Sequence, residues 1–229
     1  MKTGRQNLAG LYTRLLRFFG PQGWWPGETP FEVAVGAILT QNTGWRGAEK
    51  AVGSLKEAGF LSPRKMAALP EGKLAALIRP AGCFNLKSRR LKNFLRYLGE
   101  NHRFSMKDLA AAPPEKTREG LLGVNGIGPE TADSILLYAA RRPFFVVDAY
   151  TRRILSRHHL VSPAASYGGL QHFIVTRLPV DVQLYNEFHA LLVALGKEYC
   201  RPRGPRCDSC PLDPPAGNRA AGDGCPTPE

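Results

Sequence analysis

The chain has 229 residues, 43% of them apolar, so it can bury the core of one large domain or two small ones. Lysine and arginine outnumber aspartate and glutamate by 31 to 19, and the formal net charge of +12 favours a polyanionic partner. No apolar run approaches the roughly 18 residues that cross a bilayer, and no signal-peptide pattern follows the first methionine. We therefore expect a cytoplasmic protein with no membrane partner.

Apolar residues recur at helical spacing along most of the chain, which predicts an all-α fold. Residues 144–147 could form a short strand, but no hairpin turn or alternating strand pair accompanies them. The tail from residue 211 is rich in proline and glycine, which predicts an irregular segment. The expected helices cover residues 8–19, 31–39, 45–55, 63–69, 74–78, 87–98, 117–122, 131–140, a stretch beginning near 154, 170–178 and 184–195.

A glycine-rich turn at residues 122–128 precedes Pro129, which is typical of the first residue of a helix. Exposed peptide N–H groups at such a helix start form a site for anions. Asp148 follows about twenty residues later, at the start of the next apolar helix. A phosphate cradle beside an acid suggests chemistry on the DNA backbone. The alternative is a structural helix–turn–helix in which the aspartate only caps a helix.

Two further features are open to two interpretations each. The outer face of the helix at residues 87–98 carries five basic side chains, which form either a solvated surface or a track for phosphates. Trp24 and Trp25 stand in a segment rich in glycine and proline, where they either plug a domain junction or line a pocket for a flat ligand. The five basic residues are Lys87, Arg89, Arg90, Lys92 and Arg96.

Four cysteines near the C-terminus, Cys200, Cys207, Cys210 and Cys225, have the spacing C-x6-C-x2-C-x14-C. Four thiolates can hold either a tetrahedral zinc ion or a [4Fe–4S] cluster. The spacing alone does not choose between these two metals, and four structural thiols remain the alternative.

Together these motifs resemble the helix-hairpin-helix DNA glycosylases of the endonuclease III superfamily, from about Phe31 to Cys210. Val124–Ala132 resembles the hairpin of the family, and Val147–Arg153 resembles the segment with its essential aspartate. The resemblance implies two α-helical domains around a DNA-binding cleft, at residues 29–147 and at residues 1–28 plus 148–229. It also implies a monomer that binds double-stranded DNA containing a damaged base, in the nucleoid.

The cysteines extend the resemblance, because the first three match ligands of the family's iron–sulfur loop. The implied cofactor is a [4Fe–4S] cluster held by Cys200, Cys207, Cys210 and Cys225. The family usually places its fourth ligand only a few residues after the third, so Cys225 departs from that pattern.

A second departure is Glu130, which stands where endonuclease III carries a lysine. A carboxylate cannot form the Schiff base that strand cleavage requires, so the resemblance implies a monofunctional DNA glycosylase without lyase activity. Asp148 would stabilise the cationic sugar as the base departs and orient the attacking water. Asp148 and Glu130 are thus the candidate catalytic residues.

Within the superfamily, Trp24–Pro26, Leu39–Thr43 with Trp45, and Gly128–Ala132 most resemble the bacterial 3-methyladenine DNA glycosylases. In that branch, aromatic residues and the glutamate at these positions line the base pocket, which implies an alkylated purine as substrate. The alternatives are a glycosylase for another lesion, such as a mismatched adenine or a deaminated or oxidised base, and a non-catalytic DNA-binding module.

The resemblance also supplies candidate residues that bind the base or the DNA. Gln41 matches a residue that enters the duplex gap left by a flipped base, and Cys83 lies in the loop that wedges the opposite strand. The expected base-binding residues are Trp24, Trp25, Trp45 and Gln41, and the expected DNA-binding residues are Gly126, Gly128, Thr131, Cys83 and Lys87.

Overall fold

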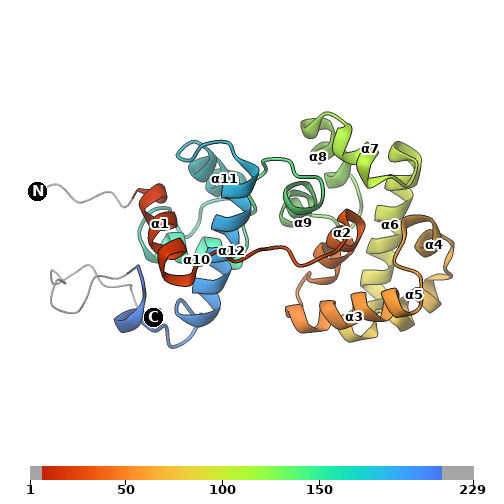
Figure 1. Ribbon diagram of the computed structural model, residues 1–229, viewed down its shortest axis with the longest axis horizontal. Coiled ribbons are helices and arrows are strands. Elements are labelled where there is room, and N and C mark those ends of the chain that lie inside the picture. The colour runs from red at the N-terminus through yellow and green to blue at the C-terminus, as the bar shows by residue number, and fades with distance from the viewer. Residues whose placement is uncertain (1–6, 213–229) are drawn as a thin grey trace, which may run out of the picture. The chain divides into compact units, whose positions relative to one another are not determined.

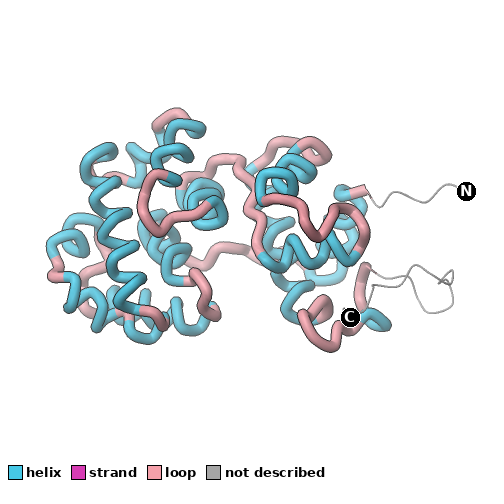
Figure 2. The backbone as a smooth tube through the Cα atoms, turned by 180° about the vertical axis from the view of Figure 1, so that it is seen from behind, coloured by secondary structure: helices cyan, strands magenta, loops and turns pink. Residues whose placement is uncertain are grey.

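A computed structural model of the protein describes residues 7–212, and within that range every regular element is helical (Figure 2). The all-α fold expected from the sequence is therefore confirmed. None of the helices in the described range is long and apolar enough to cross a membrane. Cys225 lies outside the described residues.

The chain divides into two compact units, which we describe separately: Met1–Trp24 with Phe145–Glu229, and Trp25–Phe144. We call the first the split unit, because it joins both ends of the chain, and the second the central unit. The domain boundaries expected from the family resemblance stay a prediction.

The split unit is built around its longest helix, α12, which packs against α1 and α10 (Figure 1). Its core includes Leu11, Leu15, Phe145, Tyr185 and Phe188, all of them fully buried. The helices of this unit are α1 (Leu8–Phe19), α10 (Ala149–Arg157), α11 (Tyr167–Val175) and α12 (Val182–Glu198), followed by the 3₁₀ turn η3 (Cys207–Ser209).

The central unit contains α6, the longest helix among the described residues, and an almost entirely apolar helix, α2. From Val33 to Leu39, α2 is buried on every side, as its continuous apolar sequence predicts. The helices are α2 (Pro30–Leu39), α3 (Trp45–Glu57), α4 (Pro63–Ala68), α5 (Glu71–Leu77), α6 (Phe84–His102), α7 (Met106–Ala111), α8 (Pro114–Leu122) and α9 (Pro129–Ser134), with the 3₁₀ turn η1 (Arg79–Ala81) and the π-helix η2 (Ile135–Ala139).

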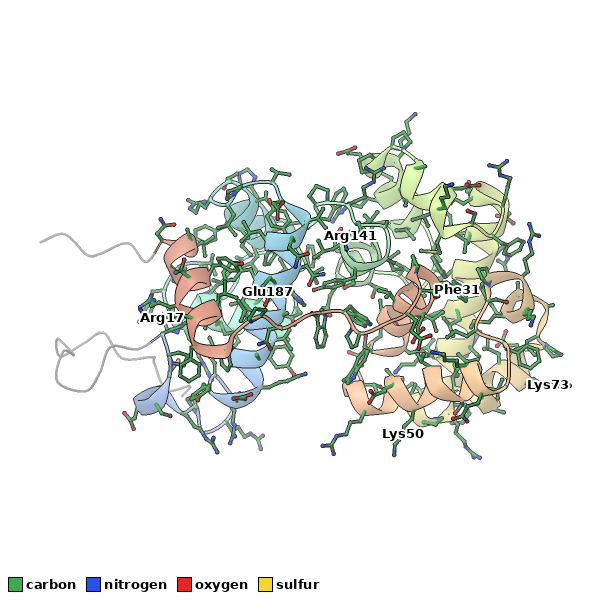
Figure 3. The ribbon with its side chains drawn as sticks, viewed as in Figure 1. Arg17, Phe31, Lys50, Lys73, Arg141 and Glu187 are labelled. Atoms are coloured by element: carbon green, nitrogen blue, oxygen red, sulfur yellow. The ribbon has the colours of Figure 1, made fainter. Side chains whose placement is uncertain are left out.

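Charged side chains lie mainly at the surface of the central unit. Lys50 of α3 and Lys73 of α5 point away from their helices into solvent (Figure 3). An exception is Asp133 of α9, which is fully buried and accepts hydrogen bonds from Arg118 of α8, at 2.6 and 3.1 Å. Because a buried carboxylate is costly without its partner, this ion pair fixes how α8 and α9 pack around the glycine-rich turn.

Residues 144–147, which could have formed a short strand, do not form one. Side chains of α11 satisfy the backbone of this segment: the peptide N–H of Val147 donates to the Tyr167 hydroxyl, and the Gln171 amide donates to the Phe145 carbonyl. The apolar run that suggested a strand is therefore a buried, extended connection that leads into α10. This connection places Asp148 at the start of that helix.

Candidate functional site

Asp148 is the N-cap of α10, and its side chain is only 12% exposed. Its Oδ1 accepts a hydrogen bond of 2.7 Å from the Thr151 peptide N–H, and its Oδ2 lies 3.5 Å from Nε2 of His189 on α12. Burial raises the pKa of Asp148, but the neighbouring imidazole and the Thr151 donor outweigh burial and leave the pKa below its usual value. The structure thus holds a buried carboxylate in its ionised form.

In the central unit, the glycine-rich turn forms one wall of an open hollow of about 380 Å³. Gly126 has a φ of +95°, and a Cβ there would come within 2.3 Å of the Arg90 side chain. At Gly128 a Cβ would meet open space, so the bare backbone faces outward at this position. The hollow is lined by Gln41, Asn42, Arg90, Gly126, Ile127, Gly128, Glu130 and Thr131.

Gln41 crosses this hollow and ties its walls together. Its amide donates to the Gly126 carbonyl at 3.0 Å and to the Thr131 hydroxyl at 2.9 Å, and its carbonyl oxygen accepts a bond from Arg90. Thr131 is buried and faces this amide, whereas Glu130, in the first turn of α9, is exposed. The glycine-rich turn, the loop after α2, α6 and α9 thus meet in one polar network.

The outward position expected for Lys87 is wrong, because this side chain is only 1% exposed. Its ammonium donates to the Leu39 carbonyl, the Thr43 hydroxyl and the Ala81 carbonyl, at 2.8, 2.6 and 2.7 Å. Burial lowers the pKa of Lys87. Lys87 therefore joins the loop after α2, which carries Gln41, to the loop before α6, which carries Cys83.

The basic face of α6 is smaller than the sequence suggests. Lys92 is turned against the end of α4, where it donates to the carbonyls of Met66, Ala67 and Leu69. Arg89 and Arg96 remain exposed on this helix. Cys83 is also exposed, at the N-cap of α6, in a left-handed conformation with φ of 44°.

Three aromatic rings of the central unit pack together. The Trp25 and Trp45 centroids are 5.2 Å apart with the ring planes at 83°, and Tyr138 of η2 lies 5.2 Å from Trp25. Two rings that hold a base between them must be parallel and about 7 Å apart, twice a van der Waals contact. Trp25 and Trp45 thus form an edge-to-face pair and leave no room for a base between two parallel rings.

Trp24 belongs to the split unit, where the ammonium of Lys197 lies 5.6 Å from the centre of its ring. A cation at this distance from an indole is attracted to the face of the ring. The three tryptophans expected at the base pocket are therefore distributed over both units.

Cys200, Cys207 and Cys210 surround one small hollow in the split unit, together with His158, Tyr199, Pro205 and Arg206. Arg157 of α10 lies 3.6 Å from the Cys200 sulfur and donates to the carbonyls of Arg201 and Pro202. Arg153, one turn earlier, donates to the Cys200 carbonyl at 2.7 Å. The C-terminal half of α10 therefore holds the cysteine loop in place.

Three convergent thiols with an adjacent guanidinium fit the chemistry of a thiolate-bound metal centre, because the cation offsets thiolate charge. Even so, no group of three or more His, Cys, Asp or Glu among residues 7–212 is arranged to hold a metal ion. Metal sites commonly complete their geometry only on binding, and the fourth cysteine lies outside the described range. The residues present are thus compatible with a cluster at this loop.

The sequence analysis missed His189, Arg153 and Arg157. His189 is 41 positions from Asp148, so only the fold brings them together, although a histidine in the strongly apolar helix α12 was a usable signal. The two arginines are four residues apart, which places them on one face of α10. That spacing could have linked them to a common partner.

Comparison with known proteins identifies related sequences and folds. The model of the HhH-GPD family, described as "HhH-GPD superfamily base excision DNA repair protein", matches residues 35–178. A candidate DNA repair glycosylase of Methanocaldococcus jannaschii, MJ1434, is 45% identical over 88% of this chain and 92% of its own length. Endonuclease III of Sulfolobus acidocaldarius is 30% identical over 79% of this chain and 78% of its own length.

Two solved structures share the fold. The 3-methyladenine DNA glycosylase MagIII of H. pylori, bound to 1,N6-ethenoadenine, has a TM-score of 0.75 and 30% sequence identity, over 84% of this chain and 98% of that one. An endonuclease III–DNA covalent intermediate has a TM-score of 0.78 at 21% identity, over 93% of this chain and 94% of that one.

The burial of Lys87 leads to a prediction about stability. Replacing Lys87 with Met preserves the length of the side chain but leaves the Leu39 carbonyl and the Thr43 hydroxyl without the ammonium donor, while the Ala81 carbonyl still accepts from Thr43. Each buried acceptor that loses its partner costs about 1–3 kcal/mol, so we expect Lys87→Met to lower the free energy of unfolding by at least about 2 kcal/mol in urea denaturation. Lys73→Met, at an exposed position, should change it by less than about 0.5 kcal/mol. Equal effects of both substitutions would contradict the internal role of Lys87.

Proposed function

The chain belongs to the HhH-GPD superfamily of base excision DNA repair proteins, and we propose that it is a monofunctional glycosylase that removes alkylated purines from double-stranded DNA. As a DNA glycosylase of this superfamily, it is an enzyme that acts on DNA. What we propose beyond family membership is that the reaction stops at base release and that the lesion is an alkylated purine. The buried carboxylate of Asp148, with the Thr151 peptide N–H at one oxygen and His189 at the other, is the observation that carries it.

The geometry of Asp148 suits a group that stabilises a developing cation. Cleavage of an N-glycosidic bond places positive charge on the sugar, and a preorganised carboxylate in a site shielded from water stabilises that charge. The Thr151 peptide N–H holds one carboxylate oxygen, and the other lies toward His189. Asp148 also orients the water that attacks the sugar. A module that only binds phosphates gains nothing from this ionised acid, which argues against a non-catalytic role.

Glu130 supports a reaction that stops at base release. An amine nucleophile would form a Schiff base with the sugar and allow strand cleavage, whereas a carboxylate cannot. Its exposed position in the first turn of α9, beside the hollow at the glycine-rich turn, is suited to a contact with the substrate. The product expected from this chemistry is an abasic site in an intact strand.

The aromatic cluster supports a flat, electron-poor base as the substrate. Because Trp25 already contacts Trp45 edge-on, we propose that the base stacks on one face of Trp45 and that Trp25 braces this ring from the side. Stacking contributes roughly 1–3 kcal/mol for any base, so selectivity comes from the positive charge and the weakened glycosidic bond of the lesion. Lys197, over Trp24, repels a cationic base from that ring, which makes Trp45 the better platform.

The hollow around Gln41 supports binding of the DNA itself. Gly126 and Gly128 would present peptide N–H groups to the phosphate backbone, and the loops that carry Gln41 and Cys83 would enter the duplex after the base is flipped. Lys87 acts in this proposal by holding these two loops together, not by contacting phosphate.

For the cysteine loop we propose a [4Fe–4S] cluster with Cys200, Cys207 and Cys210 as ligands and Cys225 as the fourth. The gathering of the first three around one hollow supports the site, and membership of a superfamily in which such clusters occur favours iron over zinc. When bound, the cluster stiffens the loop that presents Arg203 and Arg206, both exposed, to the DNA backbone. All four ligands would come from the protein, so the cluster takes no part in base removal.

The first prediction of this proposal concerns Asp148. Asp148→Asn keeps an N-cap residue at the start of α10 but removes the charge, so we expect single-turnover base release to fall by at least about 100-fold. Affinity for DNA, measured by fluorescence anisotropy, should change by less than about threefold, because phosphate contacts govern binding. Asp181→Asn is the matched control, since Asp181 caps α12 in the same way at an exposed position. An Asp148→Asn variant as active as this control would refute the catalytic role.

A second prediction concerns the lesion. Wild type should release 3-methyladenine from methylated DNA faster than adenine opposite 8-oxoguanine or thymine glycol. Trp45→Ala should lose about 10-fold or more of this activity, and Trp45→Phe should retain most of it, because a phenyl ring still stacks. If wild type ignores methylated DNA and acts on another lesion, the alkylpurine assignment fails and the glycosylase assignment stands.

A third prediction concerns the cofactor. Protein purified without oxygen should be brown, absorb near about 400 nm and contain about four irons per chain. Cys207→Ser and Cys225→Ser should both lose iron, while Cys83→Ser, far from the loop in sequence and exposed, should keep it. A colourless protein with one zinc ion per chain would exclude the cluster, and full iron content in Cys225→Ser would exclude Cys225 as a ligand.

A further inference from the structure

The Asp148 carboxylate has a second neighbour that the chemistry above does not use. His189 lies on α12 and is 5% exposed, and its Nε2 is 3.5 Å from Oδ2 of Asp148. The Phe145 ring borders the imidazole on another side, with the centroids 6.3 Å apart. The two side chains thus face each other in the interior of the split unit, where water screens their interaction poorly.

The opposing effects on Asp148 show what this neighbour does. Burial disfavours a charged carboxylate and is the largest influence on this group, so burial alone would raise its pKa above that of an exposed aspartate. The imidazole acts in the opposite direction, as do the peptide N–H and the hydroxyl of Thr151, and together they reverse the effect of burial. The Thr151 peptide N–H donates to Oδ1, whereas His189 is the neighbour at Oδ2 that can carry a positive charge.

We propose that His189 is a positioning residue that fixes the second oxygen of Asp148 and keeps this carboxylate ionised in acidic solution. The inference rests on the catalytic role proposed for Asp148, but the contact between the two side chains can be tested without it. An imidazole can carry a positive charge, and Nε2 of His189 lies 3.5 Å from Oδ2 of Asp148. His189 can therefore supply the counter-charge that this carboxylate needs in the interior.

Other titratable groups around this pair come from several elements. Tyr185, one turn before His189 on α12, has a buried hydroxyl, and Tyr167 of α11 accepts the Val147 peptide N–H next to Asp148. Tyr12 of α1 packs edge-on against Phe188. Glu187, also on α12, is bound to the Gln22 peptide N–H at 2.6 Å. The three tyrosine hydroxyls remain neutral at acidic pH, and a glutamate cannot carry positive charge. Among these groups, therefore, none supplies the positive charge that an imidazole can supply.

The test compares the pH dependence of base release in wild type and His189→Asn. Asparagine can still donate a hydrogen bond but cannot carry charge, so burial then dominates the pKa of Asp148. An opposite charge at this distance shifts a carboxylate by about 1–3 pH units. We expect the acidic limb of the single-turnover rate to move upward by at least about one pH unit, with rates at neutral pH falling far less. An unchanged acidic limb would overturn the proposal.

Tyr185→Phe is the matched control, because it alters a buried polar group on the same face of α12 without touching any charge. It should lower the melting temperature modestly and leave the acidic limb in place. If His189→Asn also changes only the melting temperature, His189 is a structural residue and the proposal fails.

A second measurement on the wild type can be made even if His189→Asn does not fold. It also distinguishes the contact between His189 and Asp148 from the catalytic role of Asp148. The carboxyl ¹³C resonance of Asp148 in the full-length wild type can be assigned by its loss in Asp148→Asn. We expect its titration below the range of ordinary aspartate, and titration at or above that range would overturn the coupling. A low titration point in an enzyme whose Asp148→Asn variant remains active would uphold the contact and refute the catalytic role instead.

Discussion

An ionised carboxylate in a protein interior requires partners, and Asp148 obtains them from two helices of the split unit. The first turn of α10 supplies the Thr151 peptide N–H together with the positive end of the helix dipole. The middle of α12 supplies His189, so the acid depends on the packing of α10 against α12. The far end of α10 holds the cysteine loop through Arg153 and Arg157. One nine-residue helix thus serves both the candidate catalytic acid and the candidate cluster site.

In the central unit, too, buried charged side chains are satisfied by specific partners, and these contacts hold the loops in place. Lys87 is a buried cation that three acceptors satisfy, and Arg118 satisfies the buried Asp133. Loops and turns with few apolar residues cannot be held by hydrophobic packing, so these polar contacts hold them in position. The result is a polar hollow whose lining loops are held by buried contacts, while the backbone at Gly128 remains open to solvent.

Much of the fold could be predicted from the sequence, because helical periodicity and end signals are local. The glycine-rich turn, Pro129 as the start of α9 and Asp148 as the cap of α10 all follow from such signals. The apolar run at residues 144–147 suggested a strand, but an apolar run does not reveal what its backbone groups bond to. Here side chains of α11, and not a neighbouring strand, form the hydrogen bonds with that backbone. Lys87 was misplaced because charge normally indicates exposure, and two of its three acceptors, Leu39 and Thr43, lie more than forty residues away along the chain.

The candidate site was harder to predict than the fold. His189 meets Asp148 only because two distant helices pack together, and no short motif contains both residues. The aromatic residues were identified by resemblance, but the edge-to-face angle between Trp25 and Trp45 depends on side-chain packing that a sequence does not encode locally. Residue identity therefore indicated the chemistry, whereas the geometry required the three-dimensional structure.

The assembly of the split unit from both ends of the chain has a consequence for biosynthesis. A chain emerging from the ribosome completes residues 25–144 before any of the later helices exist, so the central unit can fold first. Helix α1 must wait for α12, and closing that long loop costs conformational entropy. A nascent or truncated chain that ends before residue 145 would carry the glycine-rich turn without Asp148. Such a fragment would lack the candidate catalytic acid and both helices that hold it, so synthesis completes this part of the candidate site last.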